Sequence, residues 1–441
     1  MFEAGNHKTS INPICLQKKL RVLCMRYFWK SIALLCLLVS GELLAAPSVK
    51  IGLNYPQTGR YQEQGLAQRR AAFMAVDEIN AAGGILGRPV ELVIKNTGSK
   101  PDRSERNVEQ LVDEDGVVAI FGGSSSAVAI SGGKAAKSRD RIYFGTLTYS
   151  NETTGTEGHT HMFRESYNAW MGAKVLSKYL KTNYAGQKYF FITADYTWGW
   201  STERSIRIFS NTQDKDSHPG VLTPFPTALQ KDFVDALNQA QASDAKILVL
   251  VLFGDDMVRA LELATSMGMK DKMKIVVPNL TLGMAKAAGP AIMEGVVGAA
   301  PWTWEVPYIF NHPKGKEFVE KFSELYGLRP SSSAASAYSI LWQYKEAVER
   351  AGTFRTASVI KELEGHRYTL LKDEQYWREF DHQNVQTVYA VRCKPRSEVM
   401  LDEFNEDYFE IIDSMPGDEA AQTYQEWLAE RRSANKSDHL E

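Results

Sequence analysis

The stretch Val117-Val118-Ala119-Ile120-Phe121-Gly122-Gly123-Ser124-Ser125-Ser126 decides the fold class of this chain. The apolar run over residues 117–121 predicts a β-strand that is buried on both faces, as in a parallel sheet. The two glycines let the backbone turn sharply after the strand. The serines then stand where a helix over residues 127–137 would begin. Strand, glycine turn and helix in this order predict an α/β fold whose ligands lie beyond the carboxyl ends of the strands.

The same serines are also candidates for binding a ligand. A serine at a helix start can cap the helix, while backbone N–H groups of the first turn stay free. These groups and the positive end of the helix dipole suit a carboxylate, a phosphate or a carbonyl oxygen. A plain helix cap is the simpler interpretation of the serines taken alone, so the rest of the sequence has to decide between the two.

Strands and helices alternate along most of the chain. Strands are predicted at residues 49–55, 90–95, 117–121, 141–144, 189–193, 246–253, 273–277 and 295–299. Helices are predicted at residues 66–82, 103–114, 127–137, 170–180, 202–211, 232–240, 256–267, 313–326 and 333–351. Late antiparallel strands are predicted at residues 376–380 and 385–391, and a tail helix at 419–432 precedes a disordered end. This alternation, which restarts after residue 165, predicts two units built on parallel sheets.

Residues 1–46 have the pattern of a secretory signal peptide. A basic head at residues 25–30 precedes an apolar core at 31–40 and small residues at Ala45 and Ala46 for cleavage. Met25 is a candidate for the true start, because the residues before it show no fold pattern. The apolar core is too short to span a bilayer. Cys36 follows Leu35 instead of the small residue of a lipoprotein signal, so we expect no lipid anchor.

Composition restricts the function. A length of 441 residues allows two or three domains, and 44% hydrophobic and 24% charged residues are typical of a globular protein. The net charge of −2 and the lack of a basic block argue against nucleic-acid binding. Cys393 is the only one of four cysteines beyond the predicted leader, so no internal disulfide is expected. No later apolar run is long enough to span a membrane. Because the predicted leader is of a bacterial secretory type, we expect a periplasmic protein.

A second stretch carries a resemblance to a known family. Asp77-Glu78-Ile79-Asn80-Ala81-Ala82-Gly83-Gly84-Ile85-Leu86-Gly87-Arg88-Pro89-Val90-Glu91-Leu92 resembles the first helix, turn and strand of the leucine/isoleucine/valine-binding class of ABC-transporter solute-binding proteins. The resemblance continues through residues 122–126, residues 194–199 and the strand before Phe253, and it covers residues 48–393. It implies a type I periplasmic binding protein fold, in which two Rossmann-like lobes are joined by three crossovers and close on a ligand in the cleft.

The resemblance also implies how the chain divides between the lobes. Lobe 1 comprises residues 47–164 and 301–372, and lobe 2 comprises residues 165–300 and 373–414. Crossovers are expected near Arg164, Ala300 and Lys372. Residues 415–441 form an acidic tail with one helix.

Five candidate ligand-binding residues lie in lobe 1. Ser124, Ser125 and Ser126 match the family's loop that holds the ligand's carboxylate or carbonyl, and Ser125 is the first choice among them. Thr148 and Tyr149 follow the next strand and match the segment that offers a backbone carbonyl and a hydroxyl. The resemblance therefore favours the ligand-binding interpretation of the serines over the plain cap.

Four further candidates lie in lobe 2. Trp198 matches an aromatic residue that covers the ligand, and Tyr196 stands two positions before it. Phe253 ends the strand that supplies another wall of the cleft. Asn279 stands where amino-acid binders of the family often place an acid that holds the ammonium group.

Asn279 bears on the ligand class. A carboxylate forms a strong charge-assisted bond with an ammonium group, whereas asparagine offers only neutral hydrogen bonds. Residues 278–281 are closer to the amide- and urea-binding relatives, which recognise uncharged groups. Asp255 or Asp256 could supply a charge, but both fit a helix N-cap better. An amino acid, an amide, urea or a small carboxylate all remain candidate solutes.

We therefore expect a periplasmic substrate-binding component of an ABC importer, with an inner-membrane ABC permease as its partner. We expect no catalytic residues, no cofactor and no metal. His159 and His161 form a metal pair only if further ligands join them, and a polar loop is the simpler interpretation. A ligand-sensing regulatory protein of the same fold, for an amide or urea, is the alternative. A secreted α/β hydrolase is the rival from another class, but the sequence lacks a Gly-Xaa-Ser-Xaa-Gly elbow.

Overall fold

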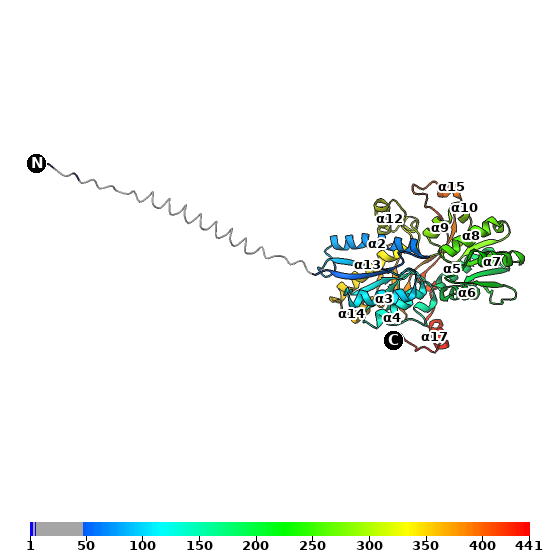
Figure 1. The fold of residues 1–441 in the computed structure, drawn as a ribbon, viewed down its shortest axis with the longest axis horizontal. Coiled ribbons are helices and arrows are strands. Elements are labelled where there is room, and N and C mark those ends of the chain that lie inside the picture. Colours follow the sequence, from blue (N-terminus) through cyan, green and yellow to red (C-terminus); the bar gives the residue numbers. More distant parts are fainter. Residues whose placement is uncertain (3–4, 6–46) are drawn as a thin grey trace. The chain divides into compact units, whose positions relative to one another are not determined.

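The computed structural model describes residues 1–2, 5 and 47–441, so the predicted signal peptide lies almost wholly outside the described residues. Residues 48–441 form one compact unit, to which the following description applies (Figure 1). None of the helices in the described residues is both long enough and apolar enough to cross a membrane.

Lobe 1 is built around a parallel sheet of five strands, in the order β2-β1-β3-β4-β5. The strands are β1 (Val49–Tyr55), β2 (Val90–Asn96), β3 (Ala119–Gly122), β4 (Ile142–Gly145) and β5 (Met162–Arg164). The helices between them are α2 (Gln62–Ala81), α3 (Pro101–Asp113) and α4 (Ser126–Lys137), with a short 3-10 helix, η1 (Asn151–Thr153). Every residue of β3 and β4 is buried, which confirms the interpretation of the opening stretch as a fully buried strand.

Lobe 2 is built around a seven-stranded sheet in the order β15-β14-β10-β9-β8-β6-β7. Its parallel strands are β6 (Tyr189–Ala194), β7 (Gly220–Thr223), β8 (Ile247–Val251), β9 (Lys274–Val277) and β10 (Val297–Ala300). Two antiparallel strands, β14 (Val388–Cys393) and β15 (Phe409–Met415), complete one edge. The helices are α5 (Ala169–Asn183), α6 (Thr197–Ser210), α7 (Gln230–Ala242), α8 (Asp255–Ser266), η2 (Met269–Asp271), α9 (Leu282–Ala288) and α10 (Pro290–Met293).

The remaining elements pack around these two sheets. They are the helices α11 (Val306–Ile309), α12 (Pro313–Tyr326), α13 (Ser332–Ala351), α14 (Thr356–Leu363) and α15 (Arg396–Val399), and the tail helices α16 (Gly417–Ala420) and α17 (Tyr424–Ser433). A small sheet consists of β11 (Arg367–Tyr368), β12 (Gln375–Trp377) and β13 (Asn384–Val385). Helix α13 packs along α2 and so covers lobe 1 (Figure 1).

Three predictions for the chain after residue 380 differ from the structure. The strand predicted at residues 385–391 is split between two sheets, because Val385 ends β13 and β14 begins at Val388. The tail helix predicted at residues 419–432 is two helices, because the Thr423 side chain caps the Glu426 backbone N–H and begins α17 afresh. The predicted disordered end is instead bonded to lobe 1, since the Glu441 carbonyl accepts from the Thr160 backbone N–H at 3.1 Å.

Lys372 links the crossovers between the lobes. The chain passes from β5 to α5 after residue 164, from β10 to α11 after residue 300, and from β13 to β14 at residues 386–387. The ammonium group of Lys372 donates to the Pro301 carbonyl, the Gln386 side-chain oxygen and the Thr387 carbonyl, each at 2.7 Å. The third crossover, expected near Lys372, therefore falls later in the sequence, while Lys372 itself holds the second and third crossovers together.

Candidate functional site

The serine loop begins where β3 comes close to β1. A Cβ on Gly122 would lie 2.1 Å from the Asn54 carbonyl oxygen, and the φ of Gly122 is +139°, so the turn requires glycine there. Ser124 follows with a φ of +68° and its hydroxyl accepts a 2.6 Å hydrogen bond from the Gln68 amide. Glycine and a strained serine thus place the next residues at the start of α4.

The three serines of this loop have different partners. Ser126 accepts a hydrogen bond from the Ser150 backbone N–H at 3.0 Å, and Ser124 is held by Gln68. Ser125 is the N-cap residue of α4 but makes no side-chain cap bond, although it is buried. Ser125 is therefore the serine whose hydroxyl is most available to a ligand.

The loop after β4 carries the other two lobe 1 candidates. The Thr148 hydroxyl is hydrogen-bonded to the Thr153 hydroxyl at 2.8 Å, so it is engaged within lobe 1. The Tyr149 hydroxyl is buried and has no hydrogen-bond partner among the described residues. Burial raises the pKa of Tyr149 well above its usual range, so this hydroxyl stays protonated. A buried hydroxyl without a partner is unfavourable unless a ligand or a water molecule forms a hydrogen bond with it.

The lobe 2 aromatic candidates lie together. Helix α6 begins at Thr197, five residues earlier than predicted, which places Trp198 in its first turn. The Trp198 and Phe253 rings meet edge to face with centroids 5.9 Å apart, and the Tyr196 ring lies 6.0 Å from Trp198. All three rings come from the carboxyl edge of β6 or β8, where the sequence placed the cleft wall.

Asn279 lies at the carboxyl end of β9 and is 2% exposed. Its side-chain oxygen accepts a 2.9 Å hydrogen bond from the Tyr167 hydroxyl, while its side-chain N–H₂ group has no partner among residues 47–441. Asn279 also lies close enough to the Tyr149 hydroxyl to oppose the rise in the pKa of Tyr149. The Asn279 side-chain oxygen is therefore already hydrogen-bonded, whereas its N–H₂ group can still donate to a ligand.

Aromatic contacts connect the two lobes. The Tyr149 ring of lobe 1 lies 6.2 Å from the Phe253 ring of lobe 2, and Tyr61 lies 5.3 Å from Phe253. The hydroxyls of Tyr61 and Tyr196 are hydrogen-bonded at 3.1 Å. The structure thus brings Tyr149, Tyr196, Trp198 and Phe253 into one cluster, which Asn279 borders. The hydroxyls of Ser124, Ser126 and Thr148 are hydrogen-bonded within lobe 1, and in the described part of the chain none of them contacts this cluster.

Four residues of the site were missed from the sequence. Tyr61, Tyr167 and Phe225 lie beside the cluster, and Gln68 lies beside Ser124. Tyr61 follows the turn at Gly59, just after the carboxyl end of β1. This is the edge of the lobe 1 sheet that faces lobe 2. An aromatic residue just after that turn is a signal of the same kind as Trp198 after β6. Gln68 and Phe225 lie in a helix and a loop with no comparable pattern, and only the fold shows their contacts.

Charged and polar contacts also join the two lobes near the aromatic cluster. Arg60 of lobe 1 forms an ion pair with Asp256 at the start of α8 and donates to the Pro226 carbonyl. Burial raises the pKa of Asp256, while Arg60 acts in the opposite direction. Gly254 is the N-cap of α8, so Asp256 is not the cap that the sequence favoured. The lobes are therefore in a closed arrangement.

The predicted histidine pair has ordinary partners. His161 is hydrogen-bonded to Asp140 at 3.0 Å, and burial lowers the pKa of His159 to about 3. Among the described residues, no three His, Cys, Asp or Glu side chains gather in a group that could hold a metal ion.

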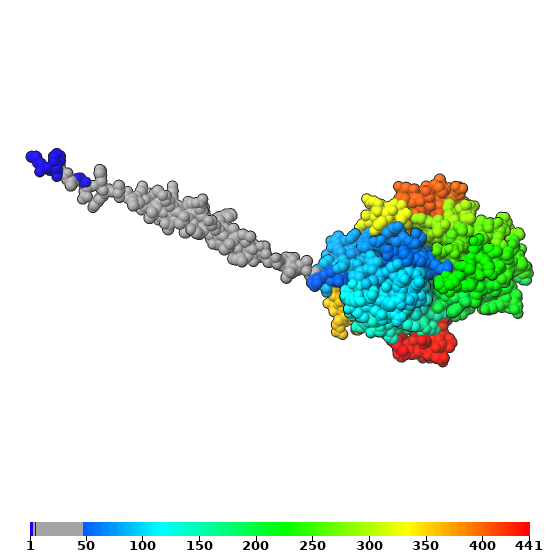
Figure 2. All heavy atoms as spheres, in the orientation of Figure 1, coloured from blue at the N-terminus to red at the C-terminus, as the bar shows by residue number. Residues whose placement is uncertain are grey.

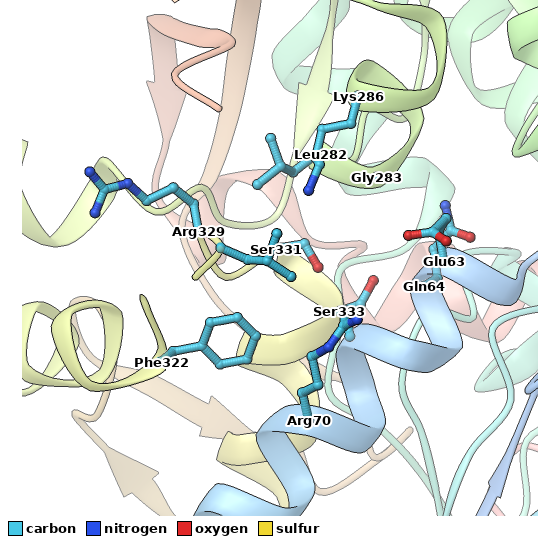
Figure 3. Close-up of a pocket in the computed structure, with 12 residues that line it drawn as sticks. Glu63, Gln64, Arg70, Leu282, Gly283, Lys286, Phe322, Arg329, Ser331 and Ser333 are labelled. Carbon is cyan, nitrogen blue, oxygen red and sulfur yellow. The ribbon is translucent and has the colours of Figure 1, made fainter. Parts of the chain in front are cut away.

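A neighbouring pocket opens between α2, α9 and the start of α13 (Figure 3). Gln64 lines this pocket and also donates to the Thr281 hydroxyl of lobe 2 at 3.4 Å. None of the nine candidate residues, all of which the structure describes, belongs to its lining. The pocket is therefore an addition to the site expected from the sequence.

Comparison with known proteins identifies the class. Residues 48–398 match the family model described as periplasmic binding protein, and the chain belongs to that family. It is 23% identical over 403 residues to Leu/Ile/Val-binding protein homolog 4 from Brucella melitensis, covering 88% of this chain and 94% of the relative. Its two-lobed fold is the type I fold of that family.

Solved structures support the same fold. A periplasmic binding protein from Burkholderia mallei shares 26% identity with a TM-score of 0.77, covering 86% of this chain and 97% of that chain. An ABC-transporter solute-binding protein from Rhodopseudomonas palustris, solved with 3,4-dihydroxybenzoic acid, shares 16% identity with a TM-score of 0.70, covering 84% and 98%. The second likeness is one of fold alone.

Proposed function

We propose that this chain is the periplasmic substrate-binding component of an ABC importer and delivers a small solute to an inner-membrane permease. The observation that carries the proposal is the aromatic cluster between the lobes, beside which buried polar atoms lack partners. These atoms are the Tyr149 hydroxyl and the Asn279 side-chain nitrogen, and among the described residues the Gln68 side-chain oxygen likewise lacks a partner, beside Ser124. Such groups would bind a polar solute whose apolar part packs on the rings.

We propose that the nine candidate residues and Tyr61 surround this solute. Ser125 and the first turn of α4 would receive an oxygen of the ligand, and Asn279 would donate to a second oxygen from the opposite lobe. Tyr149, Trp198 and Phe253 would pack on its apolar part. The solute would then touch both lobes, which only the closed state allows, so binding would favour closure.

We propose a solute of the amino-acid or amide class with an uncharged or anionic group at Asn279. None of the nine candidates carries an ionised carboxylate for an ammonium group. Glu165 is the carboxyl group that influences Tyr149, and burial raises the pKa of Glu165, which favours its neutral form. The name of the Brucella relative supports amino acids, and the Rhodopseudomonas ligand is an aromatic carboxylate, so both classes belong in the test.

A thermal-shift screen tests the proposed function. We expect isovaleramide, isovalerate, benzamide or benzoate to raise the melting temperature more than leucine, because binding to the native state alone stabilises it by about 2.7 kcal/mol at a hundredfold excess over Kd. Leucine, isovaleramide and isovalerate share one apolar group and differ in charge, so they act as matched probes. A larger shift with micromolar leucine would contradict the amide assignment, and no shift with any amino acid, amide, urea or carboxylate would contradict solute binding.

The contact between Arg60 and Asp256 gives a prediction for closure. Arg60→Met should weaken binding of the solute found in the screen by about 1–2 kcal/mol, or roughly 5- to 30-fold, because the closed state loses a charge-assisted contact that the open state lacks. Titration calorimetry measures the change. Lys188→Met is the control, since it removes an exposed ion pair with Asp244 inside lobe 2. Equal affinities for the two variants would show that Arg60 does not favour closure.

A further inference from the structure

The pocket of Figure 3, here called the α13 pocket, has features that the proposed solute site does not use. Gln64 and Arg70 of α2 lie on one side, Lys286 of α9 on another, and Ser331 and Ser333 at the start of α13 (Figure 3). The volume of the cavity is about 30 Å³, within a larger hollow that opens to solvent. Lobe 1 supplies the walls formed by α2 and α13, and lobe 2 supplies the wall formed by α9.

Two buried hydroxyls in the α13 pocket lack partners. The side chain of Ser333 is 0% exposed, and its hydroxyl makes no hydrogen bond within the part of the chain that the structure describes. The Ser331 hydroxyl is buried and unpaired in the same way. Leaving a buried hydroxyl unpaired is unfavourable, so a group that is bound there would relieve this penalty.

The start of α13 adds backbone donors beside these hydroxyls. Helix α13 is 20 residues long, and its N-cap residue Ser331 makes no side-chain cap bond. The first N–H groups of a helix have no partner within the helix, and the helix dipole makes this end positive. Ser331 and Ser333 both line the pocket, so the start of α13 borders the space that a ligand would enter.

The charges around the pocket leave one guanidinium without a partner. Arg70 is half-buried, and its guanidinium makes no hydrogen bond or ion pair with any described residue. Lys286 pairs with Glu406, and Arg329 pairs with Asp402, its guanidinium pointing away from Ser331 and Ser333 (Figure 3). Glu63 lies on the exposed rim, where water screens its negative charge. Arg70 is thus the uncompensated charge next to the unpaired hydroxyls.

We propose that the α13 pocket binds an oxyanion, either a carboxylate or a phosphate, through Arg70, the hydroxyls of Ser331 and Ser333, and the first N–H groups of α13. Hydrogen bonds between such donors and an anion are charge-assisted and are about twice as strong as neutral ones.

Lobe closure completes this site. Gly283 of α9 lies so near to α2 that a Cβ on it would be 3.4 Å from the Cβ of Glu63. The wall that contains Gly283 and Lys286 belongs to lobe 2 and reaches Arg70 only when the lobes are closed. A bound anion therefore stabilises the closed state, and this step rests on the proposed function only in that the lobes open and close.

Phosphate titration tests the site without knowledge of the solute. Inorganic phosphate should raise the melting temperature of the wild type at constant ionic strength more than chloride does, and titration calorimetry should give its Kd. Arg70→Met should weaken phosphate binding about 10- to 100-fold. Arg69→Met is the matched control, because Arg69 is the exposed neighbour whose guanidinium lies over Phe73. It should change phosphate affinity less than about threefold.

Two further variants separate binding from folding. Ser333→Ala should weaken phosphate binding severalfold without lowering the melting temperature in chloride, because it removes a hydroxyl that has no partner in the protein. Glu63→Gln should strengthen phosphate binding only slightly, because the negative charge that it removes lies on the exposed rim and is screened by water. A Ser333→Ala variant that loses stability in chloride and keeps its phosphate affinity would contradict the role of this hydroxyl.

A second arm identifies the source of the anion. If phosphate alone does not bind, the carboxylate is the far end of the solute, and Arg70→Met should abolish the preference for a dicarboxylate such as glutarate over its monoamide. If Arg70→Met and Arg69→Met behave alike with phosphate and with these compounds, the proposal is overturned. Phosphate binding in a chain that binds none of the screened solutes would overturn the proposed function and leave the α13 pocket supported.

Discussion

Arg164→Met should lower the free energy of unfolding by about 3–5 kcal/mol, which is the range for breaking a buried charged network. The Arg164 guanidinium is 0% exposed and donates to the Gln383 side-chain oxygen at 2.6 Å, the Thr154 hydroxyl at 2.8 Å and the Thr148 carbonyl at 3.2 Å. It also donates to the Ser150 carbonyl. Methionine would leave these buried acceptors unpaired, and each unpaired group is unfavourable by about 1–3 kcal/mol.

The expected loss in the free energy of unfolding is smaller than the sum of the contributions of these hydrogen bonds, because burying the charge of Arg164 is itself unfavourable. Burial lowers the pKa of Arg164 to about 9, because no carboxylate of the described residues contacts the guanidinium directly, and Asp381, Glu152 and Glu430 favour its charge only from further away. The neutral methionine avoids the desolvation of that charge. We therefore expect a destabilisation near the lower end of the range, measured by urea or guanidinium unfolding.

Controls make the Arg164 prediction specific. Arg164→Lys keeps the charge but not the planar set of donors, so it should fall between the wild type and Arg164→Met. Arg139→Met removes exposed ion pairs with Glu109 and Asp113 and should cost less than about 1 kcal/mol. A change below 1 kcal/mol for Arg164→Met would show that the loop after β4 is held by other contacts.

The same substitution has a second readout. Arg164 binds the carbonyls on both sides of Tyr149, so it positions the loop that carries Thr148 and Tyr149. In the proposed function this loop forms the lobe 1 wall of the solute site. Arg164→Met should therefore weaken solute binding by the protein that is still folded. If Arg164 only stabilised the fold, its substitution would leave that affinity unchanged.

The local pattern of the sequence was enough to predict the alternating elements. The apolar run before Gly122, the two glycines and the serines gave β3, its turn and the start of α4 at nearly their true positions. The carboxyl edges of β6, β8 and β9 likewise placed Trp198, Phe253 and Asn279 on one side of lobe 2. These predictions succeed because buried strands and helix caps depend on neighbouring residues.

Contacts between distant segments could not be predicted in the same way. The pairing of the Tyr61 and Tyr196 hydroxyls and the approach of α9 to α2 depend on how the two lobes meet. The lone donor of Asn279 depends on Tyr167, which precedes it by more than a hundred residues. No local periodicity records such pairs, so the polar partners of the site emerge only from the fold.

The tail beyond residue 398, where the family match ends, shows the same limit. This part of the chain first adds β15 to the sheet of lobe 2, the lobe to which residues 373–414 were assigned. Residues 415–441, whose acidic sequence predicted one helix, then form α16 and α17 (Figure 2, red). The Trp427 indole donates to the Thr154 carbonyl at 3.0 Å, and Arg204 of lobe 2 pairs with Glu430. The tail therefore connects the lobes in addition to the three crossovers, through a few large side chains that its composition does not reveal.

Asn279→Asp should weaken binding of an amide or carboxylate solute by about 2–3 kcal/mol, or roughly 30- to 150-fold, when measured by calorimetry at pH 8. The Tyr167 hydroxyl donates to the Asn279 oxygen at 2.9 Å, and a carboxylate would keep this bond. The free N–H₂ group, however, would become an oxygen that bears charge and repels the oxygen of the solute. For an ammonium-bearing amino acid the sign reverses, because the new carboxylate would pair with the ammonium group.

Asn279→Ala and pH separate the loss of a donor from the gain of a charge. Asn279→Ala removes the donor without adding charge and should weaken binding only about tenfold. In the Asn279→Asp variant, burial should raise the pKa of the new carboxyl group, and its protonated form can again donate a hydrogen bond. The affinity of that variant should therefore recover as the pH falls from 8 to 5, while the wild type changes little. If Asn279→Asp binds the screened solute as tightly as the wild type at pH 8, Asn279 does not touch the solute, and the ligand class must be decided by another residue of the cleft.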